Sequence, residues 1–208
     1  YKRQMELPYA IPNLAVDLHS PEIDIPVQWW RSVGHSHTGF VVESFIDELA
    51  HAAGRDPLEF RGELLGKHHR HLGVLNKVAS LAGWGKKLPK GTFQGLAVHK
   101  SFGSYIAQVA EVTVDDQGKI RVPRVFCAVD CGRVVNPDTV RAQMEGGIVF
   151  GLSAALFEEI TIKDGKVQQG NFDDFPVVRL DESPRIEVAI VTSNEKPSGV
   201  GEPGVPPI

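Results

Sequence analysis

The sequence of 208 residues predicts an α+β fold, because helical and strand patterns occupy different parts of the chain. Helical spacing of apolar residues dominates up to about residue 90, after an N-terminal segment whose prolines disfavour helix. Beyond residue 91, apolar runs separated by turn sequences predict strands, and one long helix interrupts them. We therefore divide the chain into a mainly helical part, residues 1–90, with an extended N-terminal segment, and a strand-rich part, residues 91–208.

Three helices are expected in the first part. The first spans residues 40–53, where apolar residues recur at helical spacing and Gly54 follows as a stop. A short second helix begins at Asp56-Pro57, which suit an N-cap and a first turn, and a third runs from about residue 69 to 82 before Gly83. The apolar positions of the first helix are Val41, Val42, Phe45, Leu49 and Ala52, with Glu43, Asp47 and Glu48 between them.

Two hairpins and a final strand are expected in the second part. Residues 109–114 and 120–125 flank an Asp-Asp-Gln-Gly turn and form the first hairpin. Pro123 must then sit at an edge, at a bulge or at a position that donates no ladder hydrogen bond. The second hairpin turns at residues 163–166, and residues 186–191 form the last strand.

A long helix is predicted to begin at Asn136-Pro137 and to lie across the sheet. It contains three glycines, each of which costs about 1 kcal/mol relative to alanine in a helix interior. Close approach of a ligand or of another backbone would offset this cost, and Gln143 could place an amide beside a ligand. The buried stripe consists of Val140, Met144, Ile148, Leu152 and Leu156, and the glycines are Gly146, Gly147 and Gly151.

Composition narrows the classes of partner. The net charge of -4 and the pI near 6.1 argue against a nucleic-acid partner, and no apolar run approaches the roughly 20 residues of a membrane span. Cys127 and Cys131 allow neither a disulfide framework nor a four-ligand zinc site, so we interpret them as reduced structural thiols. His35, His37 and the run at residues 68–71 lack the partners and spacing of a metal cluster, so we assign no metal ligands.

Residues 199–207 combine glycines and prolines with a single acidic residue, Glu202. A carboxylate held in a stiff turn suits a positioned general base, although such a segment is most often an ordinary loop.

Arg31 also has two possible roles, one functional and one structural. Because it follows Trp29 and Trp30, its guanidinium could bind phosphate or an oxo group, or it could stack on an indole.

Several of these segments together resemble the molybdenum-binding large subunits of the xanthine dehydrogenase and aldehyde oxidase family, in particular the isoquinoline oxidoreductase type. The match covers nearly the whole chain after about Pro26, and the common order of the motifs makes it specific. In terms of fold, it implies the C-terminal part of the molybdenum-cofactor-binding domain, within one larger region that is truncated at both ends. The matching segments are residues 30–34, 43–50, 56–61, 130–132, 135–137, 143–147 with Gly151, and 199–203.

The resemblance implies a molybdenum hydroxylase, which oxidises an N-heterocycle or an aldehyde with water-derived oxygen. Glu202 matches the family's catalytic glutamate, which takes a proton as general base. Gln143 matches a glutamine near the pterin, and Arg31 matches an arginine beside the metal. The implied cofactor-binding residues are Gln143, Arg31, Gly146, Gly147 and Gly201.

The implied cofactor is molybdopterin, with its cytosine dinucleotide form as one alternative. Electrons would pass to iron-sulfur clusters on a separate small subunit, because this chain has no cysteine set to ligate them. Val33 stands where xanthine dehydrogenases place a phenylalanine that holds a purine, so purine specificity is not carried over. The compartment, cytoplasmic or periplasmic in a bacterium, stays open.

Two other functions stay open at this stage. We interpret the chain as a piece of a longer polypeptide, expected to be inactive by itself, and it could be a non-catalytic fragment or an inactive relative that serves assembly or interaction. A generic domain whose glycine-rich turns bind a phosphate or a nucleotide is the third alternative.

Overall fold

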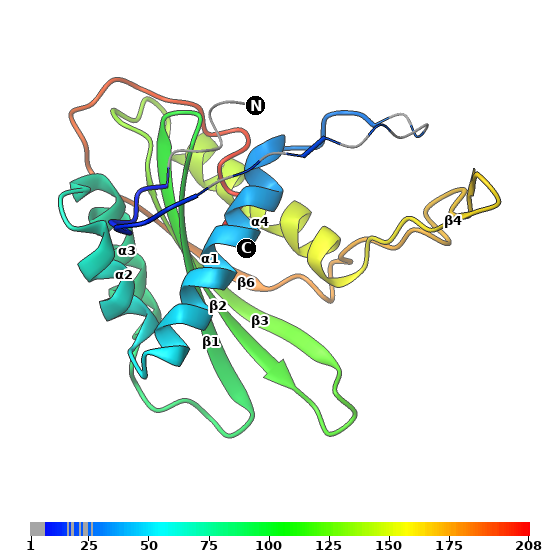
Figure 1. The fold of residues 1–208 in the computed structure, drawn as a ribbon, viewed down its shortest axis with the longest axis horizontal. Helices are drawn as coiled ribbons and strands as arrows, with labels where there is room; N and C mark the ends of the chain where they lie inside the picture. The colour runs from blue at the N-terminus through cyan, green and yellow to red at the C-terminus, as the bar shows by residue number, and fades with distance from the viewer. Residues whose placement is uncertain (1–6, 16, 18, 21, 23–24, 26) are drawn as a thin grey trace.

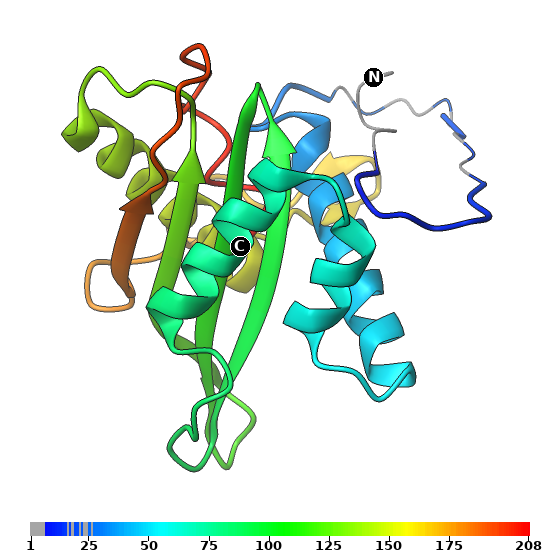
Figure 2. The ribbon, with the colours of Figure 1, turned by 90° about the vertical axis from the view of Figure 1, so that its left-hand side faces the viewer.

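A four-stranded sheet with helices on both faces forms the centre of the molecule (Figures 1 and 2). The computed structural model describes residues 7–15, 17, 19–20, 22, 25 and 27–208. The strands lie in the order β1, β2, β3, β6, and the first three are antiparallel. β6 pairs with β3 in parallel, and helix α4 connects them. The strands are β1 (Thr92–Ser101), β2 (Ser104–Val114), β3 (Ile120–Asp130) and β6 (Arg185–Ile190).

The hairpin of β2 and β3 confirms the first predicted hairpin, and β6 confirms the last predicted strand to within one residue at each end. Pro123 is exposed, and the register of β2 against β3 shifts between Glu111 and Thr113. The pairing of β3 with β6 begins only at Arg124. The proline therefore lies at a bulge, outside the parallel ladder, as its missing N–H requires.

β1 was not predicted as a separate strand. It pairs with β2 along its whole length, from Thr92 opposite Thr113 to Ser101 opposite Ser104. The tight turn between them consists of Phe102 and Gly103, both with positive φ (50° and 83°). Such turns match the twist of a hairpin, but a Phe-Gly pair is not one of its usual sequence signals, which explains why the hairpin was missed.

Helices α2 (Pro57–Leu65) and α3 (His69–Ala82) confirm two predictions, whereas α1 (Gly34–Ala52) begins six residues before the predicted start. The predicted apolar face of α1 is only partly confirmed: Val42 and Leu49 pack against the core, but Val41 and Phe45 are exposed and Glu43 is buried. Glycines allow close packing on the true inner face, so apolar spacing alone did not identify it. Its buried residues are Gly34, Gly39, Glu43, Ile46 and Ala50.

A buried ionic network holds α1 to α2 and to β1. Arg61, which is fully buried, donates to both the side chain and the backbone carbonyl of Glu43 at 2.9 Å and also forms an ion pair with Asp47. The Glu43 carboxylate further accepts hydrogen bonds from the Tyr9 hydroxyl at 2.7 Å and from the Val98 N–H at 2.9 Å. Both oxygens of the buried carboxylate are thus satisfied, which is the condition for keeping a charge inside a protein.

Helix α4 (Pro137–Leu156) begins where the sequence predicted, with the Asn136 side chain accepting hydrogen bonds from the N–H groups of Asp138 and Thr139. Met144 and Ile148 are fully buried against the face of the sheet that carries Ile106, so the predicted placement across a sheet is confirmed. The core on the opposite face consists mainly of side chains from α1, α2, α3 and the sheet.

The second predicted hairpin is present but very short: β4 (Ile162–Lys163) and β5 (Lys166–Val167) pair as a separate ribbon that projects away from the main sheet (Figure 1). Within the described part of the chain, none of the helices is long and apolar enough to cross a membrane.

Candidate functional site

The C-terminal segment, residues 199–208, is held against both α1 and α4 (Figure 1). A Cβ added at Gly39 of α1 would lie 3.0 Å from the Pro206 side chain. On α4, a Cβ at Gly147 would lie 3.1 Å from the Gly204 backbone, and one at Gly151 would overlap the Ile208 side chain. These glycines let the segment approach both helices closely, which fixes its position.

Glu202 is held in place by Ser32, at the start of α1. One carboxylate oxygen, Oε1, accepts a hydrogen bond from the Ser32 N–H at 3.0 Å, and the Ser32 hydroxyl donates to the Glu202 carbonyl oxygen at 2.6 Å. Among the described residues, none donates to the second oxygen, Oε2. The half-buried carboxylate is therefore oriented by one oxygen, while the other stays available to accept a proton.

The backbone that holds Glu202 is strained. Ser32 and Val33 have φ values of 74° and 51°, in a region that L-residues rarely adopt, least of all β-branched ones. Each such residue costs of order 1–3 kcal/mol, and it persists only where the surrounding contacts impose it. Here the conformation directs the Ser32 N–H at Glu202 and starts α1 without a side-chain cap. The absent cap explains why the sequence placed the start of α1 too late.

Arg31 joins the C-terminal segment to α4. Its Nε donates to the Gly201 carbonyl oxygen at 2.8 Å, and its Nη2 donates to Gln143 Oε1 at 3.1 Å. The guanidinium also lies over the ring of Phe150, 5.6 Å from its centroid, and Trp30 contacts the same ring. The ring beside Arg31 is therefore Phe150 and not the indole that sequence reasoning considered, because α4 brings it there from a distant part of the chain.

The glycines of α4 divide into two kinds. Gly147 and Gly151 are buried against the C-terminal segment, so the close approach of another backbone accounts for them. Gly146 is exposed, and a Cβ there would meet only Arg31 Nη1, at 4.0 Å. Protein packing thus gives no reason for Gly146, while a ligand lying on this face of α4 would. The cofactor role of Gly147 stays a prediction.

Arg31, Gln143, Gly146, Gly201 and Glu202 form what we call the cradle. Its donors are only partly used, since none of the described residues accepts from Arg31 Nη1 or from the Gln143 amide nitrogen. Donors of this kind beside an open glycine surface suit an oxygen-rich, anionic group such as the phosphate or oxo oxygens of a pterin cofactor. The residues present therefore fit the group that the sequence implied.

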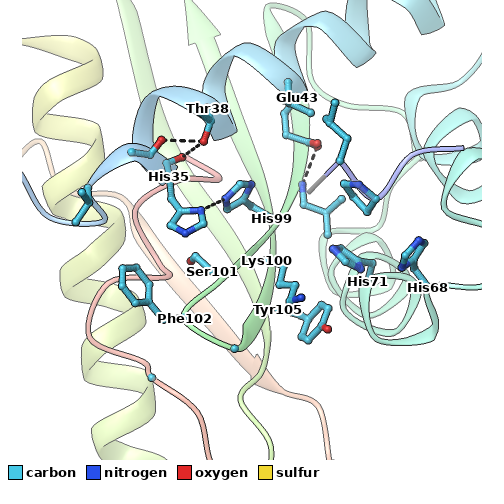
Figure 3. A pocket seen from close by; sticks show the side chains of 18 of the residues that line it. His35, Thr38, Glu43, His68, His71, His99, Lys100, Ser101, Phe102 and Tyr105 are labelled. Atoms are coloured by element: carbon cyan, nitrogen blue, oxygen red, sulfur yellow. Dashed lines mark hydrogen bonds between the residues drawn. The ribbon is translucent and has the colours of Figure 1, made fainter. Parts of the chain in front are cut away.

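A cavity of about 1620 Å³ lies beside the cradle, between α1 and β1 (Figure 3). Val33 and Gly199 line it at the Glu202 end. In its wall, His35 Nδ1 lies 3.0 Å from His99 Nε2, and the His35 ring lies 5.5 Å from that of Phe102. Sequence reasoning missed this histidine pair, because its members are 64 residues apart and His99 lies on the strand that was not predicted.

Burial keeps these histidines neutral. It lowers the pKa of His99 to about 3, with His35 adding to the effect, and it lowers the pKa of His35, which the charge of Glu202 partly opposes. Burial likewise lowers the pKa of His71, further along the cavity, to about 4. Each neutral imidazole has one N–H and one unprotonated nitrogen, so in this contact one ring donates its N–H and the other accepts it.

The other candidate groups do not assemble into a metal centre. In the part of the chain that the structure describes, no group of three or more histidine, cysteine or acidic side chains could hold a metal ion. Cys127 and Cys131 are both buried and unbonded to each other, and burial raises the pKa of each thiol.

Three curated proteins with similar sequences extend this picture. The chain is 35% identical to the beta subunit of isoquinoline 1-oxidoreductase of Brevundimonas diminuta, over 95% of this chain and 26% of that protein. It is 35% identical to a membrane-bound aldehyde dehydrogenase [pyrroloquinoline-quinone] of Gluconacetobacter polyoxogenes, over 85% of this chain and 25% of that one. It is 30% identical to a subunit of nicotinate dehydrogenase of Pseudomonas putida, over 94% of this chain and 18% of that protein. The chain thus spans about a quarter or less of the length of these relatives.

A family model also matches the chain. Residues 45–184 match the molybdopterin cofactor-binding domain, and this range contains α2, α3, the first three strands of the sheet with α4, and Gln143 and Gly146 of the cradle. Arg31 and Glu202 lie on either side of it, and their hydrogen bonds to Gly201, Gln143 and Ser32 join them to one site. The chain therefore belongs to the molybdopterin cofactor-binding domain family.

Proposed function

We propose that the chain is part of the large subunit of a molybdenum hydroxylase, which oxidises an N-heterocycle or an aldehyde. The observation that carries the proposal is the orientation of Glu202, because the Ser32 N–H donates a hydrogen bond to one oxygen of its carboxylate. It lies next to an arginine and a glutamine whose donors are not all used. The names of two relatives, which refer to isoquinoline and to an aldehyde, support the substrate classes.

Within this proposal, the cradle binds the cofactor. Arg31 and Gln143 would donate hydrogen bonds to its oxygen atoms, and Gly146 leaves the surface of α4 open for close approach. When bound, the molybdenum cofactor supplies the two-electron oxidation that amino-acid side chains cannot perform. Glu202 accepts the proton released when water-derived oxygen is transferred to the substrate, through its uncontacted Oε2. The close packing of residues 199–208 keeps this carboxylate from moving away.

The partner in this proposal is a small subunit with iron-sulfur clusters, which receives the electrons. This chain contains only Cys127 and Cys131, both buried, and a cluster needs about four thiolates. The cytosine dinucleotide form of the cofactor is a finer proposal. The substrates and the partner belong to the proposal for the whole subunit, because the chain spans only a fraction of each relative.

Replacing Glu202 by glutamine in the full-length subunit tests the proposal. The amide keeps the hydrogen bond from the Ser32 N–H but cannot take a proton, so turnover per bound molybdenum should fall roughly 10²-fold or more. Molybdenum content should stay near that of the wild type. Glu195→Gln is the matched control, since Glu195 is an exposed carboxylate seven residues earlier, and it should leave turnover unchanged.

Replacing Gln143 by alanine tests the cradle separately. This change removes an amide that would contact the cofactor without moving a proton, so molybdenum content should fall while turnover per molybdenum is retained. Metal and quinone analysis of the wild-type subunit completes the test, since the name of one relative includes pyrroloquinoline quinone. A subunit that contains no molybdenum would overturn the proposal in favour of a non-catalytic role, and near wild-type turnover of Glu202→Gln would remove the glutamate as base.

A further inference from the structure

Gln108 is a buried amide that contacts the C-terminal segment from the sheet. It lies in β2, it is only 1% exposed, and its Nε2 donates to the Gly204 carbonyl oxygen at 2.8 Å. Because a carbonyl oxygen can only accept, the atom of the side chain that faces it must be the amide nitrogen. Within the described part of the chain, no other group donates to this carbonyl. Gln108 thus provides a hydrogen bond that α1 and α4 do not.

The other end of this amide is not used. Gln108 Oε1 is buried and has no hydrogen-bond partner among the described residues. A buried polar atom without a partner costs free energy, which an apolar side chain of similar size would avoid. Gln108 also projects from the same face of the sheet as Ile106, which belongs to an apolar core. A glutamine here therefore needs a reason, and its hydrogen bond to Gly204 gives one.

The Gly204 carbonyl belongs to the turn that carries Glu202. The next N–H along the chain, that of Val205, donates to the Glu202 carbonyl oxygen at 3.0 Å and closes the turn. The Gly204 carbonyl and the Val205 N–H are parts of one planar peptide group, so a bond that orients one also orients the other. Ser32 donates to the same Glu202 carbonyl through its hydroxyl and to the carboxylate through its N–H. The contact of Gln108 is therefore connected to Glu202 through a single peptide group.

Packing and hydrogen bonding hold this peptide group in different ways. A Cβ at Gly147 would lie 3.1 Å from the Gly204 backbone, so contact limits how far the turn can move toward α4. Such contact has no preferred direction, whereas a hydrogen bond weakens steeply as its angle becomes less linear. Helix α4 thus sets the distance of the peptide group, and Gln108 sets its orientation.

We propose that Gln108 is a positioning residue for Glu202, which it holds in place through the peptide group between Gly204 and Val205. The inference rests on the proposed function, because it takes Glu202 as the base. Without the hydrogen bond from Gln108 the peptide group can rotate, and the carboxylate then spends less time in the orientation in which Oε2 can accept a proton. The expected consequence is a lower turnover with little change in KM, because Gln108 itself contacts neither the cradle nor a substrate.

Amide hydrogen exchange of the full-length subunit tests the positioning itself. Gln108→Met keeps the approximate length and volume of the side chain but cannot donate a hydrogen bond. The N–H groups of Val205 and Ser32, which both bond to Glu202, should then exchange at least about 5-fold faster. The amides of β3 should keep wild-type rates, which shows that the sheet is intact. Wild-type exchange at both Val205 and Ser32 would overturn the proposal.

Gln94→Met is the matched control. Gln94 Nε2 also donates to a backbone carbonyl, that of Ala82 at 3.2 Å, but this contact lies at the end of α3. The variant loses the same kind of hydrogen bond and should leave exchange at Val205 and turnover unchanged. An equal acceleration at Val205 in both variants would show that the effect is general loosening, and it would contradict the positioning role.

Gln108→Glu makes the contact depend on pH. A protonated carboxyl group has an O–H that can donate to the Gly204 carbonyl, whereas a carboxylate can only accept. Burial raises the pKa of such a group, so the donor persists above the ordinary range of a glutamate. Turnover per bound molybdenum, relative to the wild type at the same pH, should be near 1 at the acid end and should fall as pH rises. In Gln108→Met the same ratio should be about 10-fold lower at every pH. Equal ratios for the two variants at all pH values would overturn the proposal, since packing alone would then explain both.

Comparison with Glu202→Gln distinguishes this inference from the proposed function. If Glu202→Gln and Gln108→Met both keep wild-type turnover while exchange at Val205 is faster, the proposed function fails and the positioning of the turn stands. If Glu202→Gln loses turnover and Gln108→Met does not, Glu202 acts as base without help from Gln108, and this inference alone is overturned.

Discussion

Two arginine and glutamate sets lie in different parts of this fold, and they are arranged in opposite ways. Arg61 and Glu43 form a direct ion pair at 2.9 Å, with their side chains 0% and 6% exposed. Arg31 and Glu202 are neighbours through Gly201 and Ser32, but each bonds to backbone or amide groups, and within the described residues they form no ion pair with each other. Charges that neutralise each other stabilise a fold, whereas charges held apart keep their capacity to bind and to react.

The largest expected effect is on the first set. Replacing Arg61 by methionine would leave the buried Glu43 without its cation, which costs about 3–5 kcal/mol in the free energy of unfolding. Urea unfolding of the full-length subunit measures this change. The control is Arg55→Met, because Arg55 forms an exposed ion pair with Glu63 and should cost less than about 1 kcal/mol. Similar losses in the free energy of unfolding in both variants would mean that burial does not make one ion pair more important for stability than the other.

A second test changes pH, because His71 and His99 are kept neutral by the fold. Their pKa values, about 4 and about 3, lie below the roughly 6.5 of an unfolded histidine. As the pH falls below 6.5, the unfolded chain therefore binds protons at these histidines that the folded chain does not bind. Their contribution to stability is complete above pH 6.5 and is lost as pH falls, by up to about 2.7 kcal/mol per pH unit for the two together.

Unfolding at pH 7, 6 and 5 measures this slope. The double variant His71→Gln/His99→Gln should flatten it, while His51→Gln, at an exposed position of α1, should leave it as in the wild type. A slope that is unchanged in the double variant would show that these histidines are already protonated in the folded protein.

The smallest effects come from two adjacent glycines of α4. Gly147→Ala would press a methyl group against the Gly204 backbone at 3.1 Å and should destabilise the fold by about 1–3 kcal/mol. In Gly146→Ala the methyl group would meet only Arg31 Nη1, at an ordinary contact distance of 4.0 Å, so the change should stabilise α4 by up to about 1 kcal/mol. In the cradle, however, the same methyl group should reduce molybdenum content. A stable Gly146→Ala subunit with full molybdenum content would show that the exposed face of α4 does not contact the cofactor.

Much of the fold could be predicted from local sequence signals. The Asn-Pro start of α4 and its apolar residues at every fourth position act within a few turns of helix, so they gave its position and its buried face. The start of α1 could not be found in this way, because it depends on strained backbone at Ser32 and Val33 that only the contact with Glu202 explains. Glu43 was placed on the wrong face, because its partner Arg61 lies on another helix.

The candidate site shows the same limit. Glu202, Arg31 and Gln143 were identified through ordered motifs, and the structure brings them together through hydrogen bonds. The two histidines of the pair left no such signal, since a single histidine in a strand is most often structural. Their possible role depends on the cavity that both side chains line, and that cavity is formed by segments that are distant in the sequence.

The hydrogen bonds of the cradle also determine when it can form. They join residues that are 112 to 170 positions apart, whereas the hairpins of the sheet need only a short loop to close. Closing long loops is slow, and during synthesis the segment with Glu202 leaves the ribosome after all its partners. We therefore expect the sheet and α4 to assemble first and the C-terminal segment to dock last. Amide hydrogen exchange after refolding should then protect Ser32 later than the strands, because the cradle is completed only after the sheet and α4 have folded.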